Sequence, residues 1–285
     1  MTERQPDWQD WFGQKITQHQ FERNKREPYF RFKTYDKRFN DKLGGLATVT
    51  VDLPKATARR KVGALTMATQ QRLWDVLDWM SMQYSAGTDV QCVARVWPFA
   101  LEWALEYALH HEQYHRSPEA DNYVTPHASL RDEEYWIVAL RMVCFAILSG
   151  FGNDMPRVMA FLDYGNADMG VHDGLIERLA ASFVGSRNLY PTDTTRHLPY
   201  RRLITVFDAD PGARPALMAK YLADWYHLSR SEPYFNQHGD ADVSFYGYWS
   251  WEAGAATVVL NMDDSGYRDM PFYPRDWVDY ARTQT

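Results

Sequence analysis

Residues 129–151, SLRDEEYWIVALRMVCFAILSGF, carry the strongest helical pattern of this chain. The part from 135 to 148 is apolar almost all round, which is typical of a helix that is buried on every side. Ser129 with Asp132 forms an N-cap signal, and the acidic residues that follow suit the positive end of a helix dipole. Gly150 ends the pattern. We therefore predict a central helix here, with the rest of the chain packed around it.

Helical periods also dominate on both sides of this stretch. Apolar residues recur at steps of three and four over 68–84 and again over 90–115, where Pro98 should kink the helix or begin a new one. Only LATVTVDL, residues 46–53, alternates like a strand; a lone strand cannot make a sheet, so we expect a hairpin arm or an irregular connection. Shorter amphipathic helices are expected near residues 154–164, 172–184, 196–207, 213–228 and 246–261.

These patterns predict an all-α protein, a compact bundle-like body of about nine to eleven helices with little or no sheet. The segment 116–127 is rich in Ser, Pro, Asp and Asn, and it is the best boundary candidate. We therefore predict an N-terminal helical region at 1–125 and a C-terminal helical region at 126–285, packed as one body. The aromatic and proline-rich segment 263–276 is expected to be an ordered loop.

Composition excludes several classes of protein. The chain has 285 residues, 45% of them apolar, which is enough for a substantial core. No apolar run approaches the roughly 18 residues that a membrane span needs, and the N-terminus has no apolar signal region. Cys92 and Cys144 are too few for a disulfide scaffold and lack metal-ligand spacing. We expect a cytoplasmic protein without a cofactor.

Charge is distributed unevenly along the chain. Residues 1–66 hold 14 Lys and Arg against 8 Asp and Glu, a net charge of +6. The remaining residues hold 17 against 29, a net charge of −12. An acidic body disfavours direct contact with nucleic acid and favours a basic partner. Acidic and aromatic residues interrupt the basic N-terminal stretch, which favours a packed amphipathic region over a nucleic-acid-binding arm.

One string could hold a metal ion. Residues 111–115 read HEQYH, in which His111 and His115 could bind Zn²⁺ on a helix while Glu112 acts as general base. A third ligand could come from Glu133 or Glu134. The string lies at the C-terminal end of its helix, where histidines are favoured anyway, so a structural or surface cluster is the preferred interpretation. A zinc-dependent hydrolase is the alternative. Nucleophile motifs and phosphate-binding loops are absent, so no catalytic residue is predicted.

The densest constellation of unusual residues spans 244–277. Five aromatic residues precede Glu252, which lies among apolar residues of a predicted helix and would need a partner if buried. Arg268 is the expected partner, with Asp264 or Asp269 as further members of the network. A buried Glu–Arg pair is usually architecture rather than catalysis.

This constellation resembles the PoNi immunity proteins, which protect bacteria from PoNe-type DNase toxins. The residues that carry the resemblance are YGYWSWEA at 246–253, DDS at 263–265, RD at 268–269 and PFYP at 271–274. The resemblance extends over about 130–282, and the first 120 residues match only loosely. Gly254, Met270 and Arg275 depart from the expected alanine, histidine and aromatic residue. The positions assigned to the structural motif are Tyr248, Trp249, Glu252, Asp263, Asp264, Arg268, Asp269 and Pro274.

The resemblance implies an all-helical, non-enzymatic protein that binds a cognate toxin and blocks its DNase activity. Such toxins are delivered by type VI or related secretion systems in competition between bacteria, so the immunity protein would act in the cytoplasm of the producing cell. It implies no small-molecule substrate, membrane or nucleic-acid partner. A helical adaptor or chaperone with another client is a further hypothesis.

Acidic clusters are the expected contact surface for a basic nuclease domain. A nuclease presents cationic groups to DNA, and an inhibitor gains association rate and specificity from negative charge. The interface candidates are Glu102, Glu106, Glu112, Asp163, Asp168, Asp173, Asp240 and Asp242.

Overall fold

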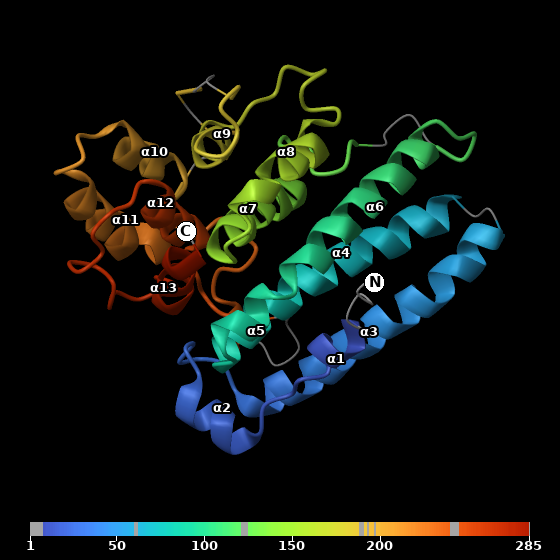
Figure 1. The fold of residues 1–285 in the computed structure, drawn as a ribbon, viewed down its shortest axis with the longest axis horizontal. Helices are drawn as coiled ribbons and strands as arrows, with labels where there is room; N and C mark the ends of the chain where they lie inside the picture. The colour runs from blue at the N-terminus through green and yellow to red at the C-terminus, as the bar shows by residue number, and fades with distance from the viewer. Residues whose placement is uncertain are drawn as a thin grey trace, which may run out of the picture. The chain divides into compact units, whose positions relative to one another are not determined.

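A computed structural model of the chain describes residues 8–59, 62–120, 125–187, 191–192, 194–196, 198–239 and 245–284. They fall into two compact units: unit 1 is Met1–Val124 with Asp240–Gly247, and unit 2 is Thr125–Gly239 with Tyr248–Thr285. Within the described residues every regular element is a helix and no strand is present, which confirms the all-α class (Figure 1). None of the described helices combines the length and the apolarity that crossing a bilayer demands.

Unit 1 is built on three long helices that lie alongside one another (Figure 1). Helix α4 (Val62–Ala86) packs against both α3 (Phe32–Ala58) and α6 (Trp97–His115). Pro98 occupies the first turn of α6, so the predicted start of a new helix is confirmed. Three shorter helices complete the unit: α1 (Trp8–Phe12), α2 (Gln18–Asn24) and α5 (Val90–Ala94).

The expected hairpin arm or irregular connection at 46–53 is wrong, because this segment lies inside α3. Phe39, Leu46 and Leu53 recur at steps of seven and are buried, so packing along α3 outweighs the β-propensity of its valines and threonines. The hydroxyl of Thr50 donates to the backbone oxygen of Leu46 at 2.8 Å, which satisfies that side chain within the helix.

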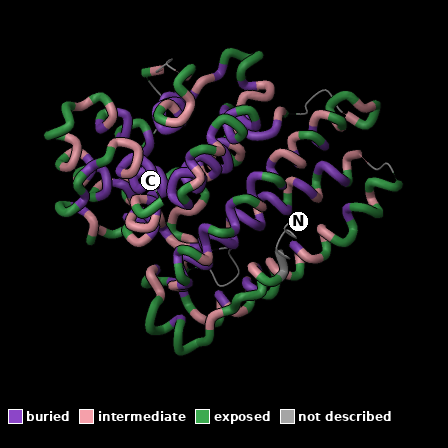
Figure 2. Tube along the Cα trace, viewed as in Figure 1, coloured by how far each residue is buried: buried purple, intermediate pink, exposed green. Residues whose placement is uncertain are grey.

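Unit 2 is organised around α7 (Glu133–Leu148), as the central-helix prediction requires. Helix α7 contacts α8 (Met155–Asp163), α9 (Gly174–Ala181), α12 (Trp251–Val259) and α13 (Arg275–Gln284). Long runs of buried residues lie on α4 in unit 1 and on α7 in unit 2 (Figure 2). The cap of α7 is Asp132 rather than Ser129, and Gly150 follows its end with a φ of +80°.

The remaining helices of unit 2 follow the predicted amphipathic pieces, with one addition. They are α10 (Arg201–Asp208), α11 (Arg214–Leu228) and the short 3-10 helices η1 (Gly152–Asp154) and η2 (Gln237–Gly239). The pattern analysis predicts no helix at α13. It buries Trp277, Val278 and Ala281 on one face, which is the spacing of a short amphipathic helix.

Candidate functional site

Glu252 is the most deeply enclosed carboxylate of the sequence motif, with 2% of its surface exposed. Its Oε1 accepts three hydrogen bonds of 2.7 Å, from Tyr221 Oη, Trp225 Nε1 and Ser250 Oγ. The predicted pairing with Arg268 is therefore wrong, because neutral donors from α11 and the start of α12 surround the carboxylate instead. Burial raises the pKa of Glu252 above its ordinary value of 4.5, and the three donors offset part of that rise.

Arg268 belongs to a second network around Asp264. Asp264 is 4% exposed, and Arg268 lies within 3.3 Å of its carboxylate. Arg282 Nη1 donates to Asp264 Oδ1 at 3.0 Å, and Tyr273 Oη donates to Oδ2 at the same distance. Arg268 also donates to Asp279 at 2.7 Å. The motif therefore contains two separate buried carboxylates. Glu252 accepts hydrogen bonds from neutral donors, and Asp264 forms ion pairs with two arginines.

The other motif residues make local contacts within the same segment. The backbone N–H and the hydroxyl of Ser265 both donate to Asp263 at 3.0 Å. The remaining pairs are Tyr248 with His238, Asp269 with Arg275, and Trp249 with Trp251. The Asp263 and Asp269 contacts lie in the segment that leads from α12 into α13, whereas the Tyr248 and Trp249 contacts lie at the approach to α12.

Gly254 shows why this chain departs from the alanine expected at that position. A Cβ atom built on Gly254 would lie 2.6 Å from Pro274 Cγ and 3.2 Å from Val278 Cγ2. Such distances are too short for carbon atoms, so α12 approaches Pro274 only because residue 254 has no side chain.

Gly254→Ala is accordingly expected to lower the free energy of unfolding by about 1–3 kcal/mol through overpacking. Urea denaturation of the variant measures the loss. Gly266→Ala is the matched control, because a Cβ atom at Gly266 meets no atom within 4 Å. Equal stability of the two variants would contradict the close approach at Pro274.

The acidic candidates of unit 1 lie on α6. Glu106 forms an ion pair with the buried Arg72, whose guanidinium lies 4.6 Å from the ring centre of Trp103. Glu112 pairs with Arg116 at 2.6 Å. Glu102 is exposed. Glu106 therefore has a structural role as well as a partly exposed carboxylate.

The acidic candidates of unit 2 divide into surface and core residues. Asp168 is exposed, and Asp163 binds Arg187 through both oxygens at 2.9 and 3.0 Å. Asp173 is fully buried, and Trp136 Nε1 donates to it at 2.7 Å while it caps α9. Placing Asp173 on a contact surface is therefore wrong, since its oxygens satisfy donors of the core. Asp240 and Asp242 lie outside the described residues.

The HEQYH string does not bring its histidines together on one accessible face. His111 is 5% exposed and packs edge-on against Tyr107, whereas His115 is exposed. Glu133 and Glu134, the candidates for a third ligand, lie at the start of α7, where Glu133 pairs with Arg196 at 3.3 Å. Across the described parts of both units, no group of three or more His, Cys, Asp or Glu side chains is arranged to hold a metal ion.

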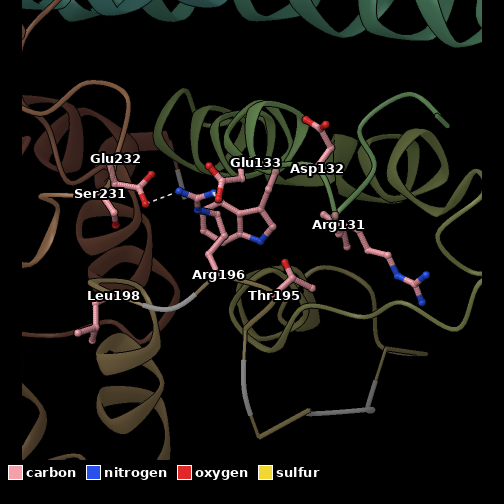
Figure 3. Close-up of a pocket in the computed structure, with 10 residues that line it drawn as sticks. Arg131, Asp132, Glu133, Thr195, Arg196, Leu198, Ser231 and Glu232 are labelled. Carbon is pink, nitrogen blue, oxygen red and sulfur yellow. Dashed lines mark hydrogen bonds and ion pairs between the residues drawn. The ribbon is translucent and has the colours of Figure 1, made fainter. Parts of the chain in front are cut away.

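A polar pocket of about 170 Å³ opens in unit 2 where three segments meet (Figure 3). These segments are the start of α7, residues 195–196 with Leu198, and the turn that follows α11. The lining residues are Leu130, Arg131, Asp132, Glu133, Trp136, Thr195, Arg196, Leu198, Ser231 and Glu232. Sequence patterns missed this site, because the three segments are far apart along the chain and only Glu133 stood out.

Arg196 and Glu232 form the floor of the pocket. Arg196 makes an ion pair with Glu232 and a second one of 3.3 Å with Glu133, and its guanidinium lies 5.9 Å from the ring centre of Trp136. Glu232 is 5% exposed, and among the described residues its buried Oε2 has no hydrogen-bond partner. Burial raises the pKa of Glu232, and Arg196 counteracts that rise only in part.

Comparisons with known proteins agree with this architecture. The fold resembles protein PA2201 from Pseudomonas aeruginosa, a crystal structure, with a TM-score of 0.63 over 86% of this chain and 89% of that chain. The two sequences are 18% identical, so the likeness concerns the fold. Comparison with curated proteins finds no match. The family model described as PoNe immunity proteins (PoNi), C-terminal, matches residues 171–277, which include Glu232, Glu252 and Asp264. Residues 171–277 are thus similar to the C-terminal domain of the PoNe immunity proteins.

Proposed function

We propose that this chain is an immunity protein that binds a cognate PoNe-type DNase toxin and neutralises it by contact, without catalysis. The family match over residues 171–277 carries the proposal. It covers α11 and α12, which the Glu252 network joins, and it includes Asp264, whose network reaches α13. A scaffold ordered in this way suits a protein that works by presenting a fixed surface, since preorganised surfaces lose less entropy on binding.

Charge supports a basic partner. Unit 2 contains 14 Lys and Arg against 19 Asp and Glu, a net charge of −5, whereas unit 1 contains 17 against 18. A DNA-cleaving enzyme needs cationic groups around its substrate, and an acidic surface speeds association with such groups. Of the acidic candidates, Asp168 and Glu102 are exposed, and Glu112 and Asp163 are partly exposed while each pairs with an arginine.

The proposed setting is the cytoplasm of a cell that delivers the toxin through a type VI or related secretion system. Co-expression with the product of the neighbouring gene should rescue growth, and the two proteins should co-elute as a complex with nanomolar or tighter affinity (Kd of about 10⁻⁹ M). Absence of both rescue and co-elution with a proven toxin from that locus would contradict the proposal.

Asp168→Lys is expected to slow association with the toxin by roughly threefold at low salt, because it reverses an exposed acidic charge in the turn between α8 and α9. Stopped-flow association rates at two salt concentrations measure the effect. Asp168→Asn should give an intermediate rate, and high salt should reduce both differences. Unchanged rates at low salt would remove Asp168 from the contact surface.

A further inference from the structure

The pocket at the start of α7 carries an excess of negative charge. Two carboxylates, Glu133 and Glu232, share the single guanidinium of Arg196. Figure 3 shows the Arg131 side chain extending away from this cluster, so its charge does not balance them. Asp132 caps α7, where its Oδ1 accepts hydrogen bonds from the backbone N–H groups of Glu134 and Tyr135. One carboxylate charge therefore remains uncompensated among the groups that line the pocket.

The buried Oε2 atom of Glu232 is the strongest indication that this pocket binds a hydrogen-bond donor. Arg196 engages the other oxygen of this carboxylate, and no hydrogen bond from a described residue reaches the buried Oε2, although the Tyr200 hydroxyl lies near the carboxylate. A buried acceptor without a donor costs about 1–3 kcal/mol, and more when it is charged. Figure 3 shows the Glu232 carboxylate directed toward Arg196 and the interior of the pocket. A donor that enters the pocket would remove this cost.

The chemistry of the lining selects a cation with an apolar stem. An anion would meet the carboxylates of Glu133 and Glu232, and the only guanidinium facing it is already shared between them. Leu130, Trp136 and the 38%-exposed Leu198 supply apolar walls against which methylene groups can pack. The volume of about 170 Å³ exceeds what a single water molecule needs by about tenfold.

We propose that this pocket receives an arginine side chain of a protein partner, whose guanidinium bridges the carboxylates of Glu133 and Glu232. A guanidinium has five donors in a planar fork, which suits two carboxylates that lie on either side of one site. That the partner is the nuclease toxin rests on the proposed function. Glu133 is 72% exposed and marks the entrance, and the buried Glu232 lies at the inner end.

The first test uses a defined probe and does not depend on the toxin. N-acetyl-arginine methylamide is titrated into the full-length protein, with N-acetyl-citrulline methylamide as a neutral probe of the same shape. We expect saturable NMR shifts at the amides of Glu133, Trp136 and Glu232 with the arginine probe and none with citrulline. Equal shifts with both probes, or shifts there with inorganic phosphate instead, would overturn the proposal.

Two neighbouring glutamates provide matched variants. Glu133→Gln should abolish the arginine shifts, whereas Glu134→Gln should preserve them, because Glu134 is exposed on the same turn and does not line the pocket. Both side chains are exposed, so both variants should keep the wild-type melting temperature. Loss of binding in both variants alike would indicate general attraction to the acidic start of α7 and would overturn the specific site.

The second test uses the toxin encoded by the neighbouring gene. Glu133→Gln is expected to weaken the complex by roughly tenfold or more, with less than about a twofold change for Glu134→Gln. An unchanged affinity in Glu133→Gln would overturn the role of the pocket in toxin binding while leaving the proposed function intact. If the wild-type protein does not bind the toxin at all, the proposed function fails, and the arginine and citrulline comparison still decides what the pocket accepts.

Discussion

Glu252→Ala is expected to lower the free energy of unfolding by about 3 kcal/mol or more. The substitution removes the acceptor for Tyr221, Trp225 and Ser250, which all donate to Oε1 at 2.7 Å inside unit 2. Each buried donor left without an acceptor costs about 1–3 kcal/mol, and the vacated volume adds a cavity term. Urea denaturation followed by tryptophan fluorescence measures the loss.

Glu252→Gln separates the role of the acceptor oxygen from that of the charge. The amide oxygen can still accept from the same donors, so this variant should be much more stable than Glu252→Ala. Because burial raises the pKa of Glu252 in the folded state, the folded protein holds this proton to a higher pH than the unfolded chain does. The wild-type protein therefore loses stability as the pH rises from about 4.5 through the raised pKa, and Glu252→Gln should not show this loss.

Unfolding curves at pH 4 and pH 7 test the sign. The stability of Glu252→Gln relative to wild type should be greater at pH 7 than at pH 4, whereas the exposed Glu134→Gln should show no such change. If Glu252→Ala keeps full stability and yet loses protection against the toxin, Glu252 belongs to the contact surface and the buried network is not its role.

Arg187→Ala is expected to destabilise unit 2 by about 3–5 kcal/mol. Arg187 donates to Asp163 through two bonds and to Glu177 through two more, of 2.8 and 2.6 Å. Glu177 is 3% exposed, so the substitution leaves a buried carboxylate whose remaining partner among the described residues is His172 at 3.2 Å. Removing one partner of a buried pair costs more than the pair itself contributes, because the other charge stays desolvated.

Arg202→Ala is the matched control for this prediction. Arg202 and Asp224 form an ion pair of 2.6 Å in which both side chains are more than two-fifths exposed. Its loss should cost no more than about 1 kcal/mol. Arg187→Lys should recover only part of the stability, because a lysine cannot form the fork with both carboxylates. A loss for Arg187→Ala as small as that for Arg202→Ala would show that Glu177 is not held in a buried pair.

The predicted contact residues illustrate how far charge patterns reach. Acidic residues near the start of a helix predict surface charge equally well at Asp168 and at Asp173. In the structure, Asp168 is exposed and Asp173 is fully buried. Asp173 accepts from Trp136 Nε1 and from the first turn of α9. The distinction depends on which side of α9 faces α7, and this orientation is a property of packing.

Local and periodic features were readable from the residues alone. The apolar run of α7, the helix start at Pro98 and the all-α class follow from spacing and capping, which act within a few residues. The residues of the C-terminal motif showed the resemblance to the PoNi immunity proteins. The tertiary structure decided what depends on distant neighbours. Residues 46–53 became helix because Leu46 and Leu53 pack within unit 1. The donors to Glu252, Trp225 and Tyr221, lie 27 and 31 positions away along the chain. The pocket around Glu232 is lined by three distant segments, and only folding brings such groups into contact.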